Sequence, residues 1–328
     1  MTANRVTFID ALRGFSLLGI LQANLLIFQY GMSGTDGVKD LSALDNVALY
    51  FEKIFIGGSF MPIFGILFGY SFVKLVESKL KKKRKSLWSI LRRATGLIAL
   101  GLLHSLLWEG DFLLSYGIMT LFIFPFINCK PRTLFIWAGI AFVYVQVLPM
   151  IVHPLLLIGM GLAKKQAFTN MEGEKKWYWT GLLLVPVGVA CKSISLMSST
   201  NSIVLMDIGS QLLAVGYVCL AAWIYKTRPV QMLAPAFESV GKLSLTNYLM
   251  QTVICTAVFY EYGLGLSGKL GIFGGMLFGI VLYSLQCVIS LAYLKKFKQG
   301  PCEVLLRMWT NWSWGRQSKA KPIESTLH

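Results

Sequence analysis

Apolar stretches of roughly 20 residues recur along almost the whole chain, and they constrain its fold more than any other feature. A helix of that length crosses the roughly 30 Å of hydrocarbon in a lipid bilayer. Because hydrocarbon offers no hydrogen bonds to the backbone, each stretch is expected to be helical. The sequence therefore predicts an all-α, polytopic transmembrane helical bundle. The stretches cover residues 12–30, 51–73, 87–108, 111–128, 177–198, 203–225, 240–262 and 270–294.

The charge pattern separates a membrane protein from a soluble nucleic-acid-binding protein. Hydrophobic residues make up 55% of the 328 residues and charged residues 14%, and the mean hydropathy is +0.62. A soluble domain of this length needs more charge on its surface. The net charge of +16 is concentrated in short segments between the apolar stretches, where basic residues mark the cytoplasmic side of a membrane. We therefore expect a lipid bilayer with anionic lipids as partner, and no nucleic acid.

Residues 133–163 decide the predicted topology, because they can form one long helix or two short helices broken at Pro149 and Pro154. A single crossing would place Lys164, Lys165 and the basic C-terminal segment outside, against the positive-inside rule. Two crossings place every strongly basic segment inside. The sequence thus predicts about ten spans with both termini cytoplasmic, and a sixth helix that is short and tilted or partly re-entrant.

The predicted organisation is a bundle over residues 1–298 followed by two short C-terminal segments. Residues 299–316 carry Glu303 and Arg307 four residues apart and three tryptophans, which is typical of an amphipathic helix in the membrane interface. Residues 317–328 are expected to form a disordered cytoplasmic tail. The first apolar stretch is expected to remain as a helix, since no small-residue cleavage pattern follows it.

Several kinds of chemistry have no support in the sequence. The six cysteines are scattered singly without a CxxC pair, so we expect small core residues and neither disulfides nor a metal site. The sequence has no Walker loop, GxGxxG, HExxH or GxSxG motif. Nucleotide hydrolysis, zinc proteolysis and serine hydrolysis are therefore not indicated.

The string GLLHSLLWEGDFLLSY holds the strongest catalytic candidate, His104, with Asp111 seven residues further on. The ordinary pKa of histidine suits proton transfer near neutral pH, and ionisable groups inside a membrane are commonly functional. A hairpin turn would bring His104 level with Ser115 and Tyr116, so the spacing alone leaves its contact with Asp111 open. The alternative is a structural histidine, which is also what we expect of His153 at an outer turn.

Three arginines are candidates for binding a phosphorylated donor at the inner face. Arg13 lies near the start of the first helix, and Asn24, about three turns further on, shares its face. Arg92 and Arg93 enter the third helix, where guanidinium groups can fork onto phosphates. The alternatives are that Arg13 reaches lipid headgroups and that Asn24 hydrogen-bonds a neighbouring helix.

A stripe of polar residues marks the two helices before the C-terminal segments. Ser244, Asn247 and Gln251 recur at i, i+3 and i+7 on the ninth helix, and the tenth helix adds Gln286. Such a stripe either joins neighbouring helices or lines a path for a polar substrate.

Two further carboxylates lie in the half of the membrane predicted to face outward. Asp207 is placed about one turn below the outer surface, where a buried carboxylate needs a partner or a proton. Glu52, beside Lys53, is expected to be interfacial and solvated. We therefore add Asp207, and not Glu52, to the candidate substrate path.

Three segments resemble the YeiB family of bacterial multi-pass membrane proteins. They are RVTFIDALRGFSLLGILQAN, RRATGLIALGLLHSLLWEGDFLLSYGI and GKLSLTNYLMQTVICTAVFYEYGLGLSGKLG, the last followed by Gln286 and GPCEVLLR. The resemblance covers essentially the whole chain in order. The opening segment also resembles the wider transmembrane acyltransferase superfamily, which includes the O-acyltransferases of cell-surface polysaccharides and the lysosomal heparan glucosaminide N-acetyltransferases.

That resemblance implies a bundle in the bacterial cytoplasmic membrane that moves an acyl group from cytoplasmic acyl-CoA, such as acetyl-CoA, to an acceptor at the other face. By the same resemblance, Arg13 matches the first-helix arginine of the superfamily, and His104 with Asp111 matches the YeiB hairpin motif. The chain departs from the superfamily because its first helix carries Asn24 and no histidine. Members of the YeiB family have also been labelled as transport proteins.

Two functions therefore use these residues, and a third, a non-catalytic scaffold or lipid binder, needs none of them. An acyltransferase acting on a glycan or lipid acceptor would use His104 as general base, tuned by Asp111. A transporter of a small polar or amphipathic solute would use the same pair, or Asp207, to relay protons. Both functions need a polar path through the bundle, so the path alone does not separate them.

Overall fold

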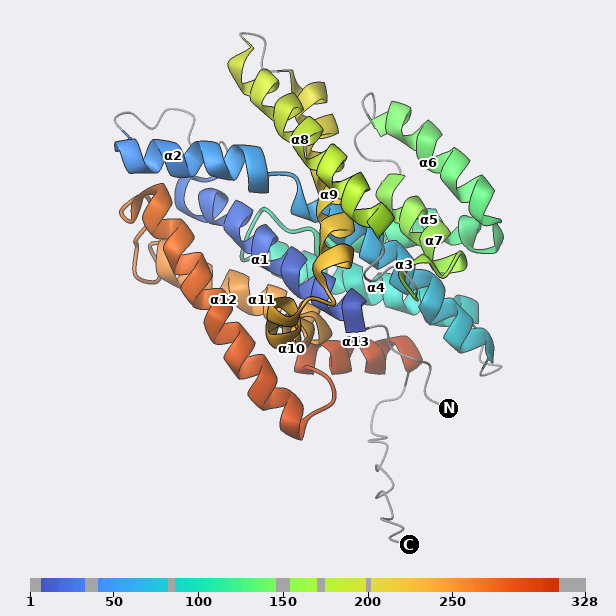
Figure 1. Cartoon of the computed structure of the whole chain (residues 1–328). Coiled ribbons are helices and arrows are strands. Elements are labelled where there is room, and N and C mark those ends of the chain that lie inside the picture. The colour runs from blue at the N-terminus through green and yellow to red at the C-terminus, as the bar shows by residue number, and fades with distance from the viewer. Residues whose placement is uncertain are drawn as a thin grey trace, which may run out of the picture.

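The computed structural model describes residues 7–32, 41–81, 86–145, 154–169, 175–198 and 202–312, and every regular element in these ranges is helical (Figure 1). The all-α class predicted from the sequence is confirmed. The α-helices are α1 (Thr7–Tyr30), α2 (Ala43–Phe51), α3 (Phe60–Lys81), α4 (Ser86–Ser105), α5 (Leu113–Ile123), α6 (Pro131–Val145), α7 (Pro154–Lys164), α8 (Lys175–Met197), α9 (Ile203–Ile224), α10 (Arg228–Lys242), α11 (Ser244–Phe259), α12 (Gly271–Lys296) and α13 (Pro301–Asn311). Three short elements are the π-helical η1 (Glu52–Ile56) and the 3-10 helices η2 (Phe124–Asn128) and η3 (Ala167–Thr169).

The length and apolar composition of the helices identify a membrane protein. Five helical segments in the described residues are long and apolar enough to cross a bilayer. The shorter apolar helices, such as α7 with 11 residues, fall below that length. Ten spans and cytoplasmic termini remain a prediction. The five segments are Thr7–Tyr30, Ala43–Leu80, Lys175–Met197, Ile203–Ile224 and Gly271–Lys296.

The ambiguous stretch after residue 133 forms two helices, α6 and α7, that run in opposite directions. Lys164, the last residue of α7, donates from its ammonium to the carbonyls of Ile127 and Cys129, both at 2.6 Å. Those carbonyls come just before α6, so the end of α7 returns to the start of α6 (Figure 1). The chain therefore turns back on itself here, and the two-helix alternative is confirmed. That both helices cross the bilayer stays a prediction. His153 lies outside the described residues.

One predicted span is divided into two helices. The stretch 240–262 was expected to be continuous, but α10 ends at Lys242 and α11 begins at Ser244. The backbone of Leu243 leaves the helical region at φ −107° and ψ 30°. The carboxylate of Glu303, from α13, accepts hydrogen bonds from the backbone N–H groups of Leu245 at 2.8 Å and Thr246 at 3.2 Å. A new helix start is thus stabilised by an acid at its positive end.

Glycines allow α1 and α10 to cross in backbone contact. A Cβ atom on Gly14 would lie 2.1 Å from the carbonyl oxygen of Phe237, and one on Gly241 would lie 1.8 Å from that of Asp10. Both distances are far below van der Waals contact, so only glycine fits at either position. Tyr283 of α12 donates to the carbonyl of Gly14 at 2.7 Å and joins the third helix to the crossing.

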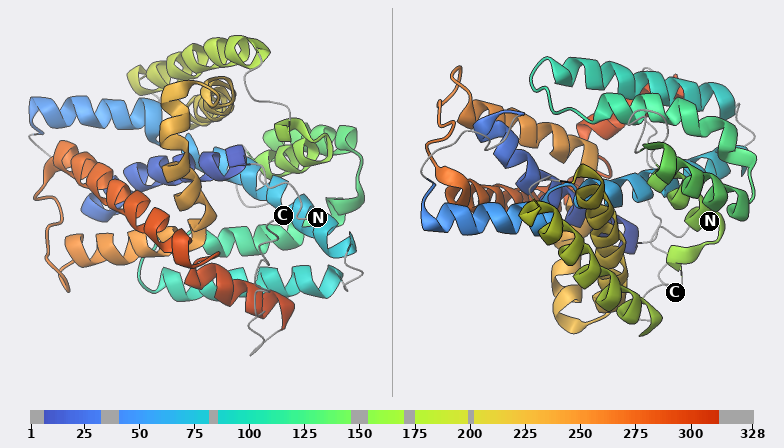
Figure 2. Two further views of the ribbon diagram at one scale, coloured as in Figure 1. Left: turned by 60° about the horizontal axis from the view of Figure 1, so that its bottom comes forward. Right: turned by 90° about the horizontal axis from the view of Figure 1, so that it is seen from above.

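The pairs α4–α5 and α8–α9 lie on opposite sides of the bundle, with α1 and α3 between them (Figure 2). The C-terminal helix α13 packs against α4 and α11. Trp309 of α13 donates from its indole nitrogen to the hydroxyl of Thr95 at 3.1 Å, and Leu306 packs against Leu97. The segment predicted to be an amphipathic interfacial helix therefore also packs as one wall of the bundle. Residues 317–328 lie outside the described part of the chain.

Candidate functional site

His104 and Asp111 are in direct contact at the turn of the α4–α5 hairpin. The Nδ1 atom of His104 lies 2.7 Å from Oδ1 of Asp111, and both side chains are buried. The carbonyl of His104 accepts the last helical bonds of α4, from Leu107 at 3.0 Å and Trp108 at 3.1 Å. The turn that follows folds Asp111 back onto the histidine. The contact that spacing alone left open is therefore present.

The start of α5 fixes the carboxylate of Asp111. Its Oδ1 accepts from the N–H of Leu113 at 3.0 Å, and its Oδ2 accepts from the N–H of Leu114 at 2.9 Å. An acid at this position caps the helix and interacts favourably with its dipole. The aspartate thus has a structural role in α5 as well as its contact with His104.

The hydrogen bond to Asp111 selects the chemical state of the histidine. A carboxylate beside Nδ1 favours the tautomer that carries its proton on Nδ1, which leaves a basic lone pair on Nε2. Nε2 of His104 is buried and has no hydrogen-bond partner among the described residues. Trp108, whose ring centroid lies 6.3 Å from that of His104, likewise has a buried indole N–H without a partner in these ranges. An imidazole held in this way, with Nε2 unbonded, has the geometry that a general base requires.

Tyr248 of α11 completes the polar cluster around the hairpin. Its hydroxyl donates to Oδ1 of Asp111 and accepts from the backbone N–H of Phe112, both at 3.4 Å. Its ring centroid lies 5.2 Å from that of His104. Tyr248 was not among the predicted site residues, because its partners come from a hairpin more than 130 residues earlier.

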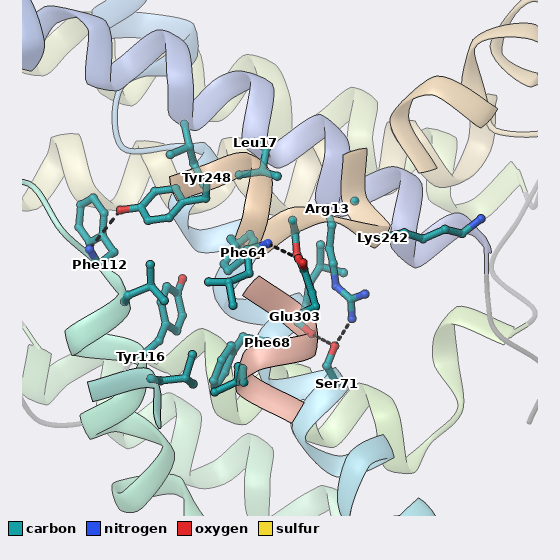
Figure 3. Close-up of a pocket in the computed structure, with 18 of the residues that line it drawn as sticks. Arg13, Leu17, Phe64, Phe68, Ser71, Phe112, Tyr116, Lys242, Tyr248 and Glu303 are labelled. Carbon is teal, nitrogen blue, oxygen red and sulfur yellow. Dashed lines mark hydrogen bonds between the residues drawn. The ribbon is translucent and has the colours of Figure 1, made fainter. Parts of the chain in front are cut away.

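A cavity of about 390 Å³ lies between α1, α3, α4, α5, α11 and α13 and ends against Tyr248 (Figure 3). Its walls are largely apolar and aromatic. Tyr116 lies on the same side as Tyr248, and Phe64 and Phe68 lie between these tyrosines and the end that carries Arg13 (Figure 3). The cavity therefore has one polar cationic end and one aromatic end. The aromatic end reaches the His104–Asp111 pair through Tyr248 and through Leu113, whose N–H donates to Asp111.

Two of the three predicted phosphate-binding arginines, Arg13 and Arg93, line the cavity. Arg13 donates to Asp10 at 2.9 Å and to the hydroxyl of Ser71. Arg93 is close enough to Arg13 and to Glu303 for the charge of each to act on its guanidinium.

Lys242 and Arg307 also border the cationic end, with the ammonium of Lys242 directed away from Glu303 (Figure 3). Four cations there meet three acids, which are Glu303, Asp10 and Glu238. The Nζ atom of Lys242 lies 3.5 Å from Glu238. The oxygens of Glu303 are already engaged by the start of α11. The end of the cavity therefore carries a net positive charge, which suits phosphate groups.

Arg92 does not line the cavity. Its guanidinium carbon lies 6.0 Å from the ring centroid of Trp312, outside the cavity wall. Consecutive residues of an α-helix point about 100° apart, so only one of two neighbouring arginines can face the same space. The sequence pattern did not reveal which one.

The polar stripe joins α11 to α12. Asn247 donates to the hydroxyl of Ser290 at 3.1 Å, and Gln251 donates to the side-chain oxygen of Gln286 at 2.9 Å. Gln286 donates in turn to the carbonyl of Asn247 at 3.0 Å. These residues account for one another's hydrogen bonds, as the interhelical alternative predicts. Of the stripe, only Ser244 lines the cavity; Asn24 of α1 is buried but is not part of its lining.

Two expectations about the outer carboxylates are wrong. Asp207, expected to be buried, is exposed on α9 because it lies in the first turns of the helix, while Glu52, expected to be solvated, is 4% exposed. The sequence also missed Lys192 of α8, which is completely buried. A lysine five residues from a helix end is commonly expected to reach solvent, and only the packing of η1 over it buries the ammonium.

Comparisons with known proteins identify relatives without an assigned activity. A family described as a protein of unknown function (DUF418) matches residues 162–313. The uncharacterised protein YxaH of Bacillus subtilis is 27% identical, with 96% of each chain covered. An uncharacterised 39.9 kDa protein in the amylase 3' region of Bacillus acidopullulyticus is 23% identical over 93% of this chain and 94% of its own.

The uncharacterised protein YeiB of Escherichia coli is also 23% identical, over 92% of this chain and 95% of its own length. No solved structure gives a significant match. These relatives confirm the resemblance to the YeiB family.

Proposed function

We propose that this member of the YeiB family is a transmembrane acyltransferase that moves an acyl group from cytoplasmic acyl-CoA to a cell-surface or lipid-linked acceptor. One observation carries the proposal. The cavity has a cationic end and an aromatic end, and the aromatic end stops at Tyr248, the residue that contacts Asp111 and faces His104. A donor with phosphates at one end and a reactive thioester at the other has this distribution of polarity.

The donor would enter from the cationic end. Arg13 and Arg93 would bind the phosphates of coenzyme A, with Lys242 at the border of the same end. The acyl end would lie along Phe64 and Phe68, toward Tyr248. This orientation requires the cationic end to face the cytoplasm of a bacterial cell, as the predicted topology has it.

His104 would act as general base. Its Nε2 would take the proton from a hydroxyl or amine of the acceptor as that oxygen or nitrogen forms a bond with the thioester carbonyl carbon. The carbon–sulfur bond then breaks, and the proton passes from His104 to the leaving thiolate, giving free coenzyme A and the acylated acceptor. Asp111 would stabilise the transient imidazolium. The Tyr248 side chain stands between the cavity and His104, so it would have to turn aside to bring the groups together.

The direct test is transfer of label from acetyl-CoA. Purified protein in nanodiscs is supplied with radiolabelled acetyl-CoA and a bacterial extract of lipids and glycans, and the label is followed into organic and polymer fractions. We expect transfer with the wild-type protein and at least a hundredfold loss with His104→Gln, which removes the base. Absence of coenzyme A binding and of any transfer would refute the proposal. Solute-driven proton flux in proteoliposomes, without transfer, would favour the transporter.

A pair of neighbouring arginines supplies a matched control for the donor site. Arg93→Gln should raise the KM for acyl-CoA about tenfold or more with little change in kcat, because it removes a charge-assisted contact to a bound phosphate. Arg92→Gln removes the same charge from the next residue, which lies outside the cavity, and should leave both constants unchanged. Equal effects of the two substitutions would contradict the assignment of the cationic end.

A further inference from the structure

A second cavity, of about 370 Å³, lies where the η1 turn meets the end of α8 and the start of α9. Glu52, Ser195, Asp207 and Ser210 are among the side chains that line it. It is remote from the cationic end of the first cavity. The second cavity lies near the start of α3 and the cationic end lies near Ser71, and α3 rises about 17 Å between Phe60 and Ser71. It also lies on the α8–α9 side of the bundle, opposite the His104 hairpin (Figure 2).

Glu52 borders this cavity with an unused carboxylate. The residue is 4% exposed, and within the described part of the chain its carboxylate makes neither a hydrogen bond nor an ion pair. A Cβ atom on Gly57 would lie 3.0 Å from Oε1 of Glu52, so the glycine leaves the carboxylate its space. A buried carboxylate without hydrogen bonds is costly, and donors from a ligand would recover that cost.

The buried Lys192 does not satisfy Glu52. Its ammonium donates to the carbonyl of Gly57 at 2.5 Å and lies 3.3 Å from the hydroxyl of Ser59. The lysine therefore holds the turn between η1 and α3, and it acts on Glu52 only through its charge. The lone pairs of Glu52 remain available to the cavity.

The serines of the cavity also offer acceptors. Ser195 donates its hydroxyl proton to the carbonyl of Ser202 at 2.8 Å, and Ser210 donates to that of Met206 at 2.9 Å. Each hydroxyl oxygen then presents only lone pairs to the cavity. Asp207 adds an exposed carboxylate at the rim. A ligand that fits this lining must supply hydrogen-bond donors.

The charges around the cavity exclude a strong preference for a cation. The carboxylates of Glu52 and Asp207 are balanced by Lys53, which also lines the cavity, and by Lys192 behind it. An uncharged ligand with several hydroxyl groups satisfies the acceptors without adding net charge. Leu196, Ile203 and Met206 supply an apolar edge that suits the C–H face of such a ligand.

We propose that this cavity binds the hydroxyl-rich, uncharged part of a ligand, such as a sugar or polyol, with Glu52 as its main acceptor and Asp207 as a second acceptor at the rim. The site is independent of the His104–Asp111 pair and of the cationic cavity. A test of ligand binding in this cavity can therefore fail or succeed independently of the acyl-transfer test.

The test is saturation-transfer difference NMR on the full-length protein in phosphatidylcholine nanodiscs, which contain no sugar or glycerol headgroup that could compete. Methyl α-glucoside is the probe, and ethanolamine is the cationic comparison. We expect the glucoside to bind the wild-type protein. It should bind the Glu52→Gln variant about tenfold more weakly and the Asp207→Asn variant a few-fold more weakly. Glu77→Gln removes a carboxylate of α3 that is paired with Lys74, and should leave binding unchanged.

Three results would overturn the proposal. The first is the absence of a glucoside signal at millimolar glucoside. The second is an unchanged glucoside signal with both cavity variants. The third is an ethanolamine signal stronger than that of the glucoside. If Glu52→Gln fails to fold, Asp207→Asn decides the question, because Asp207 is exposed and its substitution leaves the buried turn intact.

Discussion

The His104–Asp111 contact predicts a stability effect that can be measured without any substrate. Asp111→Ala removes a buried hydrogen bond of 2.7 Å to His104 and the two bonds that cap α5. A hydrogen bond to a charged group contributes about 1.5–3 kcal/mol, and a helix cap about 0.5–2 kcal/mol. We therefore expect Asp111→Ala to lower the free energy of unfolding by about 2–5 kcal/mol.

A double-mutant cycle isolates the pair from the cap. His104→Ala, Asp111→Ala and the double variant are unfolded by titrating dodecyl sulfate into mild detergent micelles, and the free energies of unfolding are compared. The coupling energy should be about 1.5–3 kcal/mol, since the cap and the histidine packing cancel in the cycle. Glu109→Ala, two residues before Asp111 and exposed, should change stability by less than about 0.5 kcal/mol. A coupling below about 0.5 kcal/mol would refute the pair as a structural unit.

The isosteric variant Asp111→Asn separates the structural and chemical roles of this carboxylate. Its amide oxygen can still accept one of the two bonds from the start of α5, so part of the cap survives. The charge that would stabilise an imidazolium is lost. In the transfer assay we expect Asp111→Asn to lower activity at least a hundredfold, with a much smaller loss of stability than Asp111→Ala. Activity equal to that of the wild type would mean that Asp111 only caps α5.

Three further substitutions test the packing and the polar cluster. Gly241→Ala should prevent accumulation of folded protein, because its Cβ would lie 1.8 Å from a carbonyl oxygen, whereas Gly139→Ala, with open space around it, should elute normally in size-exclusion chromatography. Lys192→Met should lower the free energy of unfolding by about 2–3 kcal/mol in the same dodecyl sulfate titration, because it leaves the carbonyl of Gly57 without its donor. Tyr248→Phe should cost about 0.5–1.5 kcal/mol, since it removes two long hydrogen bonds and keeps the ring; a loss above that range would indicate contacts beyond these two.

The membrane fold was predictable because the lengths and charges of consecutive segments indicate it, without any knowledge of tertiary contacts. Long apolar segments identify spanning helices without knowledge of their neighbours, and basic residues between them suggest where the chain reverses. The division of residues 133–163 into two helices was predicted in this way, and α6 and α7 confirm it. The break at Leu243 was not predictable, because the carboxylate that stabilises the new helix start comes from Glu303, almost 60 residues later.

The candidate site was predictable only where one hairpin or one helix contains it. His104 and Asp111 are close in sequence, and the turn between them is short. The choice between Arg92 and Arg93 depends on the rotation of α4 against its neighbours, which no local pattern records. Glu52 and Lys192 were misjudged or missed for the same reason, since their burial results from the packing of η1 against α8.

The glycine crossing of α1 and α10 has a consequence for redesign of the cavity. Arg13 and Lys242 each lie next to one of the glycines in backbone contact, so main-chain atoms fix where both side chains begin. The aromatic walls, by contrast, are made of side chains such as Phe64 and Phe68, which can be exchanged one at a time. Substitution of these side chains can therefore change which size of apolar group the cavity accepts. The distance between the backbone positions of Arg13 and Lys242 cannot be changed by single substitutions in the same way.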